Sequence, residues 1–126
     1  IYIMPTTIDE DGAKARRWPQ QWFRPDQPYL KYPSDSNLFW LRKAGIDLPD
    51  DFVPEQITNT QAEAICEAMG LFGTPQECLE RLKRASSESG IEHVFIFPTH
   101  TQGGGYEMPR KEVKAFRDVI IPSLST

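Results

Sequence analysis

The chain has 126 residues, of which 39% are hydrophobic, with eleven prolines and a formal net charge of −4. Its length suits one domain or part of one, and its composition excludes a disordered chain. Basic residues are interleaved with acidic ones, so the chain lacks a basic stripe for nucleic acid, and no apolar run approaches the roughly 20 residues that cross a bilayer.

The first residues predict a strand. Ile1 to Met4 is an apolar run, and Pro5 cannot donate a hydrogen bond to a central ladder, so we expect a buried strand that ends at Met4 or Pro5. Thr6 and Thr7 then belong to the following loop. Natural domains seldom begin within a strand, so we expect either a trimmed chain or a larger protein that has lost its N-terminal part.

A helix and an aromatic segment are predicted next. Acidic residues at the start and basic residues at the end favour a helix from Ile8 to Trp18, which Pro19 ends or kinks. Residues 19–35 hold four prolines and several aromatic residues. Exposed rings at that density would promote association, so we expect this segment to be ordered over another surface.

Two further helices have recognisable starts. Ser34 or Ser36 can cap a short helix that ends at Gly45. After a loop, Thr58 or Asn59 starts a helix that continues to Met69.

The segment from Gly73 to Pro98 carries the clearest local signals. Thr74, Pro75 and Glu77 form a capping box with proline in the first turn, and Gly90 is placed to end the helix. Residues 91–98 follow as a nearly continuous apolar run, which is typical of a parallel strand buried on both faces.

The C-terminal part predicts a loop and a last helix. A polar, glycine-rich loop covers Thr99 to Glu107, and Pro109 opens a helix that Pro122 ends. The order helix, strand, loop, helix is a β/α repeat, and the sequence contains two convincing strands. Two parallel strands leave open sheet edges, so a missing upstream segment, a partner chain or a second copy must complete the fold.

Three stretches together resemble the closing part of the luciferase-like monooxygenase superfamily. Members of that family commonly end with a Gly-Thr/Asp-Pro-Glu-Glu helix start, a Gly-Val-Asp-His strand and a Phe-x-x-x-Val-x-Pro helix. The matching stretches are Leu71 to Leu82, Gly90 to Pro98 and Phe116 to Pro122.

The resemblance implies an α/β fold, namely the C-terminal part of a (β/α)8 TIM barrel that is incomplete in this chain. Residues 1–18 would supply a strand and helix, residues 19–64 an irregular excursion, and residues 65–126 the closing β/α unit. The resemblance also implies a flavoprotein oxidoreductase or monooxygenase, with FMN or the deazaflavin F420 bound at the C-terminal ends of the strands, where barrel enzymes place their chemistry.

Residues that follow the predicted strands are the candidate site. His100 comes directly after the last strand and is the candidate catalytic residue, able to donate a hydrogen bond or shuttle a proton; the alternative is a solvated loop histidine. The candidates for cofactor binding at the rim are Pro5, Thr6, Thr99, His100 and Gln102.

Other reactive groups have structural explanations. His93 lies within the predicted strand, where packing or a backbone hydrogen bond is expected. Gly103 to Gly105 match no phosphate-binding fingerprint and suggest a mobile lid or a simple loop. Cys66 and Cys78 are expected to be reduced thiols, and the sequence has no Cys/His cluster for a metal.

Two classes of function remain open. The first is a fragment of a luciferase-like oxidoreductase, inactive alone, with a small-molecule substrate and a missing N-terminal barrel segment or a second copy as partner, and a homodimer is expected. The second is a non-catalytic α/β module that binds a protein partner through its exposed edge and aromatic segment. In either case we expect a cytoplasmic protein with no nucleic-acid or membrane partner.

Overall fold

The computed structural model describes residues 2–23, 25, 33–49, 52–99 and 108–124. The chain is an α/β protein with a small parallel sheet. Its elements are β1 (Tyr2–Ile8), α1 (Gly12–Ala15), α2 (Trp18–Trp22), α3 (Asp35–Lys43), the 3-10 helix η1 (Pro54–Gln56), α4 (Asn59–Met69), β2 (Leu71–Gly73), α5 (Pro75–Ser89), β3 (Val94–Pro98), α6 (Arg110–Ala115), the π-helical segment η2 (Phe116–Ile120) and α7 (Ile121–Leu124).

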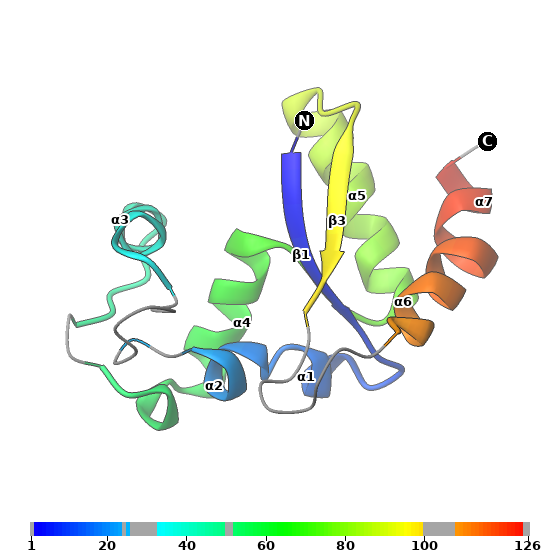
Figure 1. Ribbon diagram of the computed structural model, residues 1–126. Helices are drawn as coiled ribbons and strands as arrows, with labels where there is room; N and C mark the ends of the chain where they lie inside the picture. The colour runs from blue at the N-terminus through cyan, green and yellow to red at the C-terminus, as the bar shows by residue number, and fades with distance from the viewer. Residues whose placement is uncertain (1, 24, 26–32, 50–51, 100–107, 125–126) are drawn as a thin grey trace.

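The sheet has three parallel strands in the order β2-β1-β3, with β1 in the centre. Figure 1 shows β1 beside β3. β1 pairs with β3 from Tyr2 to Thr6, whereas β2 pairs only with the last residues of β1, from Thr6 to Ile8. The third strand, β2, was not expected. It is three residues long and follows α4 directly, so the apolar stretch before Gly73 is too short to predict a strand from sequence.

The expectation that β1 ends at Met4 or Pro5 is wrong, because the strand continues to Ile8 and includes Thr6 and Thr7. The amide of Thr99 donates to the Thr6 carbonyl oxygen at 3.0 Å, so even-numbered residues of β1 direct their backbone groups to β3 and odd-numbered residues to the other side. The nitrogen of Pro5 therefore lies on the β2 side, where pairing begins only at Thr6. No ladder hydrogen bond is lost at the proline.

Gly70 allows the chain to enter β2 close to β1. A Cβ atom on this residue would overlap the Pro5 carbonyl oxygen. A side chain here would force the strands apart, so a glycine is needed at the point where α4 passes into β2.

Two helical predictions also need correction. The helix predicted from Ile8 to Trp18 is shorter, because Ile8 ends β1 and α1 covers only Gly12–Ala15. Pro19 does not end it but lies in the first turn of α2, where a missing N–H costs no hydrogen bond. Likewise, Pro122 does not end the last helix: it lies at the start of α7, after the π-helical η2. The wider turn of a π segment accommodates a proline that a continuous α-helix would exclude.

β3 was expected to be buried on both faces, and this is wrong. Phe95 and Phe97 expose 58% and 39% of their surface, because no described element covers the face on which they lie. His93 precedes β3 and is exposed, so it lies outside the strand in which it was predicted.

The predicted helix starts are confirmed. Ser34, Thr58 and Thr74 cap α3, α4 and α5, each in a reciprocal capping box with the residue three positions on. Gly90 ends α5 in the left-handed conformation, at φ 64°, as a C-terminal glycine commonly does.

The apolar side chains form two clusters on either side of the sheet. One lies between the sheet and the layer of α5 and the C-terminal helices, and it includes Met4, Ile8, Leu79 and Ile120. The other joins α2, α3, α4 and the loops around them, and Trp18 connects it to the sheet by stacking on Phe72 of β2. In Figure 1, α5 and α6 accordingly lie on one side of β1 and β3, whereas α3 and α4 form a separate lobe beyond β1.

That lobe contains most of the predicted excursion. The described parts of residues 19–64 hold most of α2, all of α3 and η1, and the first half of α4, so the boundary expected at residue 64 falls inside α4. Trp18 and Phe23 are buried there, and Tyr29 and Tyr32 lie outside the described residues. Within the described chain, no helix has the length and apolar character needed to cross a membrane.

Replacing Thr74 with alanine should lower the free energy of unfolding by about 1 kcal/mol, because the α5 cap loses the hydroxyl that accepts from the Glu77 amide. Thr74→Ser retains that hydroxyl and is the matched control. Urea unfolding followed by circular dichroism measures both variants, and equal stability of the two would contradict the importance of this cap.

Candidate functional site

The residues predicted for the site lie at the end of the sheet where the strands finish. Because the strands are parallel, the C-terminal ends of β1, β2 and β3 meet at one edge. The described rim candidates lie on β1 and directly after β3, and the pairing of these two strands brings them together.

A ladder of cross-strand pairs covers the exposed sheet face. Ile3 lies opposite Phe95, and Pro5 lies opposite Phe97. One step further towards the C-terminal edge, the side-chain hydroxyls of Thr7 and Thr99 are in contact. Successive side chains of a strand alternate between the two faces, so these pairs share one face. We call this set the threonine-ended ladder: it is apolar over most of its length and ends in two half-buried hydroxyls.

The rim candidates have different positions. Pro5 lies within β1 on the threonine-ended ladder. Thr6 is fully buried, and its hydroxyl donates to the Met4 carbonyl oxygen at 3.1 Å. Thr99 is half-buried beside Thr7. His100 and Gln102, like the glycines 103–105, lie outside the described residues.

Thr7 is the residue that sequence reasoning missed. Because Pro5 was taken as the end of the strand, Thr7 was assigned to a loop. The alternation of Ile3, Pro5 and Thr7 could have indicated it. These residues follow the two-residue period of a strand, which continues past the proline.

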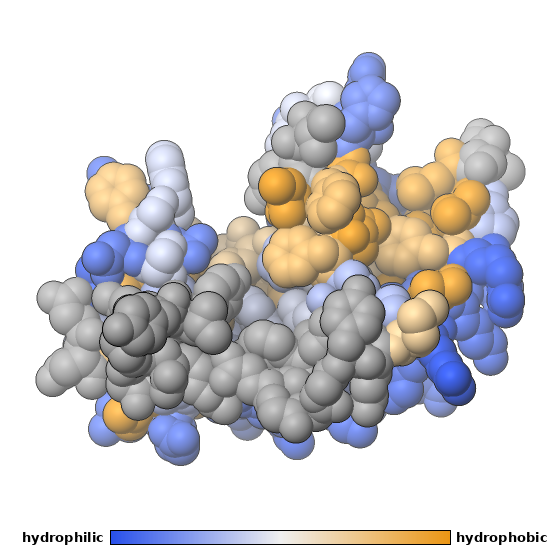
Figure 2. All heavy atoms as spheres, in the orientation of Figure 1, coloured by the Kyte–Doolittle hydropathy of each residue, from blue (hydrophilic) through white to orange (hydrophobic). Residues whose placement is uncertain are grey.

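An apolar groove borders the ladder. Its volume is about 460 Å³, and Figure 2 shows hydrophobic side chains gathered over β1 and β3 beside a hollow that separates them from the α3 lobe. Asn37 is its polar lining residue, and its side chain is already engaged by the Ser34 cap. The other lining residues are Ile3, Pro5 and Phe97 of the sheet, Trp40, Leu41 and Ala44 of α3 and its end, and Ala68 and Met69 of α4. This groove suits an uncharged, apolar ring or chain.

The last helix is tied to the rim by polar contacts. The Lys111 ammonium binds the Asp9 carboxylate at 2.7 Å, and the Ile8 amide donates to the Glu112 carboxylate at 3.2 Å. The hydrogen bond from Lys111, together with the Asp11 amide, lowers the pKa of Asp9 below its ordinary value. These contacts hold α6 beneath the C-terminal end of β1.

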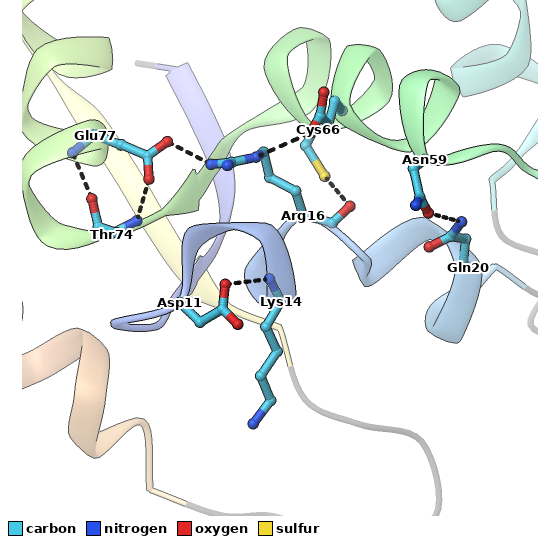
Figure 3. Close-up of polar contacts among 9 residues, drawn as sticks. Asp11, Lys14, Arg16, Gln20, Asn59, Cys66, Thr74 and Glu77 are labelled. Atoms are coloured by element: carbon cyan, nitrogen blue, oxygen red, sulfur yellow. Dashed lines mark hydrogen bonds and ion pairs between the residues drawn. The ribbon is translucent and has the colours of Figure 1, made fainter.

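A second cavity, of about 490 Å³, lies between α4 and α5 and is charged. Figure 3 shows its centre: the Arg16 guanidinium binds the Glu77 carboxylate at 2.5 Å, and the Cys66 thiol donates to the Arg16 carbonyl oxygen at 3.5 Å. Arg84 likewise binds Glu67 at 3.0 Å. The arginines are neutralised by neighbouring glutamates, so this cavity is not built for an anionic ligand.

Neither cysteine is suited to nucleophilic chemistry. Burial raises the pKa of Cys66 and raises the pKa of Cys78 to about 12, so both remain thiols at neutral pH. Both are free thiols. Across the part of the chain that the structure describes, no group of three or more His, Cys, Asp or Glu residues is arranged to hold a metal ion.

Comparison with known proteins gives no relatives. No protein-family model, no curated protein and no solved structure matches this chain. The resemblance to the luciferase-like family therefore rests on the sequence stretches alone.

The Arg16–Glu77 ion pair should make stability depend on pH. Partial burial opposes ionisation of Glu77, but the Thr74 amide and the Arg16 guanidinium outweigh it and lower the pKa of Glu77 below the ordinary value of 4.5. Because the pKa of Glu77 is lower in the folded than in the unfolded protein, the ionised carboxylate stabilises the fold at pH values above 4.5. This stabilisation is lost as the pH falls through the lowered pKa of the folded state.

Glu77→Gln should therefore be less stable than the parent at neutral pH by about 1 kcal/mol or less, since the pair is partly solvent-exposed. The difference should shrink as the pH is lowered through the acidic range. Urea unfolding of both proteins at a series of pH values measures it, with the exposed Glu55→Gln as control. A gap that does not change with pH would show that the ion pair is not its source.

Proposed function

We propose that this chain is the C-terminal part of a flavin-dependent oxidoreductase or monooxygenase of the luciferase-like kind, which uses FMN or F420 and is inactive until the rest of a (β/α)8 barrel is added. The observation that carries the proposal is the threonine-ended ladder, an uncovered apolar sheet face that ends in hydroxyls at the edge where barrel enzymes bind their ligands.

The arrangement of strands supports this proposal under one condition. Consecutive strands of a barrel are neighbours, yet here β1 lies between β2 and β3. The order agrees with a barrel if β1 and β3 are the consecutive barrel strands, with α5 as their connection. β2 is then a short extra strand beside the barrel rather than one of its strands, since it has three residues and pairs only with the end of β1.

The lining of the rim fits the ring system of a flavin or deazaflavin. Phe97, which exposes 39% of its surface, offers an apolar face for a planar ring, and the Thr7 and Thr99 hydroxyls can donate to or accept from its polar edge. When bound, such a cofactor supplies hydride transfer. Near the described rim, Lys111 and Lys114 lie among three acidic residues, which would repel an anion. The phosphate of the cofactor is therefore assigned to barrel strands outside this chain.

The alternative is a non-catalytic α/β module that binds a protein. The exposed aromatic pair of α3 favours it: Phe39 and Trp40 pack edge to face at 5.3 Å and remain more than half exposed. Exposed rings of this kind are typical of interaction surfaces.

Intact mass and a visible absorption spectrum of the protein purified from its source cells separate the two functions. A mass well above the 14.4 kDa of this chain, together with absorption from a bound flavin or deazaflavin, is expected. A species of 14.4 kDa that takes up neither FMN nor F420 would refute the oxidoreductase.

In the complete protein, Thr99→Val and Thr7→Val should each weaken binding of the cofactor about three- to tenfold, since each removes one hydrogen-bonding group at the rim. Titration followed by flavin fluorescence measures the change. Thr60→Val, on the exposed side of α4, is the matched control. Unchanged affinity in both rim variants would remove these hydroxyls from the site.

A further inference from the structure

β1 extends beyond the end of β3. In the described chain, the last backbone hydrogen bond between the two strands runs from the Thr99 amide to the Thr6 carbonyl oxygen, at 3.0 Å. The next backbone N–H of β1 that faces β3 is that of Ile8, because the direction of the backbone groups alternates along a strand. β3 ends at Pro98, and the acceptor for the Ile8 amide comes from another element.

A side chain of α6 supplies that acceptor. Glu112 accepts the Ile8 amide hydrogen through Oε1, with the nitrogen and oxygen 3.2 Å apart. The preceding residue, Lys111, binds the Asp9 carboxylate at 2.7 Å. Two consecutive residues of α6 therefore hold the two residues that follow Thr7, and Figure 1 shows α6 at this end of β1.

Glu112 makes the stronger of these two attachments. The Glu112 side chain is half-buried, whereas the Lys111 side chain exposes 66% of its surface. Ion pairs between exposed groups contribute little to stability, because water and salt screen them. A hydrogen bond between a carboxylate and a partly buried backbone N–H contributes more. Glu112 therefore does most to fix this end of β1.

The end of β1 determines where the Thr7 hydroxyl lies. Hydrogen bonds hold the residues on both sides of Thr7, namely Thr6 and Ile8. The Ile8 side chain is buried on one face of the sheet. The Thr7 side chain points to the other face, where its hydroxyl contacts that of Thr99. Without an acceptor for the Ile8 amide, the end of β1 would fray and the two hydroxyls would separate.

We propose that Glu112 is a positioning residue of the rim: its carboxylate holds the end of β1 so that the Thr7 hydroxyl stays beside that of Thr99, facing the polar edge of the cofactor ring. This inference rests on the proposed function, which supplies the cofactor. Glu112 acts through Thr7 rather than on the ring itself, because α6 packs on one face of the sheet and the threonine-ended ladder lies on the other.

A simpler role for Glu112 is stabilisation of α6. The residue lies in the first turn of this helix, where a negative charge interacts favourably with the helix dipole. That role would depend neither on the Ile8 amide nor on the Thr7 hydroxyl. Variants that change these groups one at a time therefore separate the two roles.

In the complete protein, Glu112→Ala should weaken cofactor binding about three- to tenfold, as the loss of one rim hydroxyl does. Glu112→Gln keeps a carbonyl oxygen for the Ile8 amide and should stay within about twofold of the parent. Glu88→Ala is the matched control, because Glu88 is exposed near the C-terminal end of α5. Fluorescence titration with FMN and with F420 measures all three variants.

A second set of titrations uses Thr7→Val as the background. If Glu112 acts through the Thr7 hydroxyl, Glu112→Ala should weaken binding by less than about a further twofold once that hydroxyl is absent. A general loss of helix stability would instead reduce binding by the same factor in both backgrounds.

Hydrogen exchange followed by mass spectrometry tests the contact without any cofactor. In a peptide that includes Ile8, one amide should exchange at least about tenfold faster in Glu112→Ala than in the parent. Glu112→Gln should restore the slow exchange, because it restores the acceptor.

Four outcomes would overturn the inference and leave the proposed function in place. They are unchanged cofactor affinity in Glu112→Ala, an effect that adds in full to that of Thr7→Val, a Glu112→Gln variant that binds as weakly as Glu112→Ala, and unchanged exchange at the end of β1. A complete protein that binds neither FMN nor F420 would overturn the proposed function, and the role of Glu112 with it.

Discussion

The parallel pairing of β1 with β3 is the contact on which the rest of the molecule depends. It joins segments about ninety residues apart in the chain, with Tyr2 opposite Val94 and Thr6 opposite Pro98. The pairing sets the alternation of backbone groups along β1. Pro5 is tolerated in a central strand because its nitrogen faces the side on which β2 has not yet begun.

The same alternation separates the two faces of the sheet. Met4 and Ile8 of β1 pack with α5 and the C-terminal helices in one apolar cluster. Odd-numbered residues meet Phe95, Phe97 and Thr99 on a face that the described elements leave largely open. An open apolar face of this kind is an association surface, and the proposed barrel would cover it.

Several charged groups hold elements of the structure together. Arg16 connects α1 to the start of α5 through Glu77, and Lys111 and Glu112 attach the last helix to the end of β1. The two thiols are buried and remain protonated. Neither thiol is therefore an activated nucleophile.

Helix starts and the α/β class were determined by the sequence itself, because a capping box, a first-turn proline and a C-terminal glycine act within a few residues of one another. Thr74, Pro75, Glu77 and Gly90 predicted α5, and the structure has it between those residues. The length of β1, the existence of β2 and the exposure of β3 were decided only by the tertiary structure. Each depends on which distant segment lies alongside: Thr7 belongs to a strand because Phe72 pairs with it, and Phe95 is exposed because no described element covers it. Such contacts leave no signal in the local pattern of residues, so the hydroxyl pair of Thr7 and Thr99 emerges only when the strands are assembled.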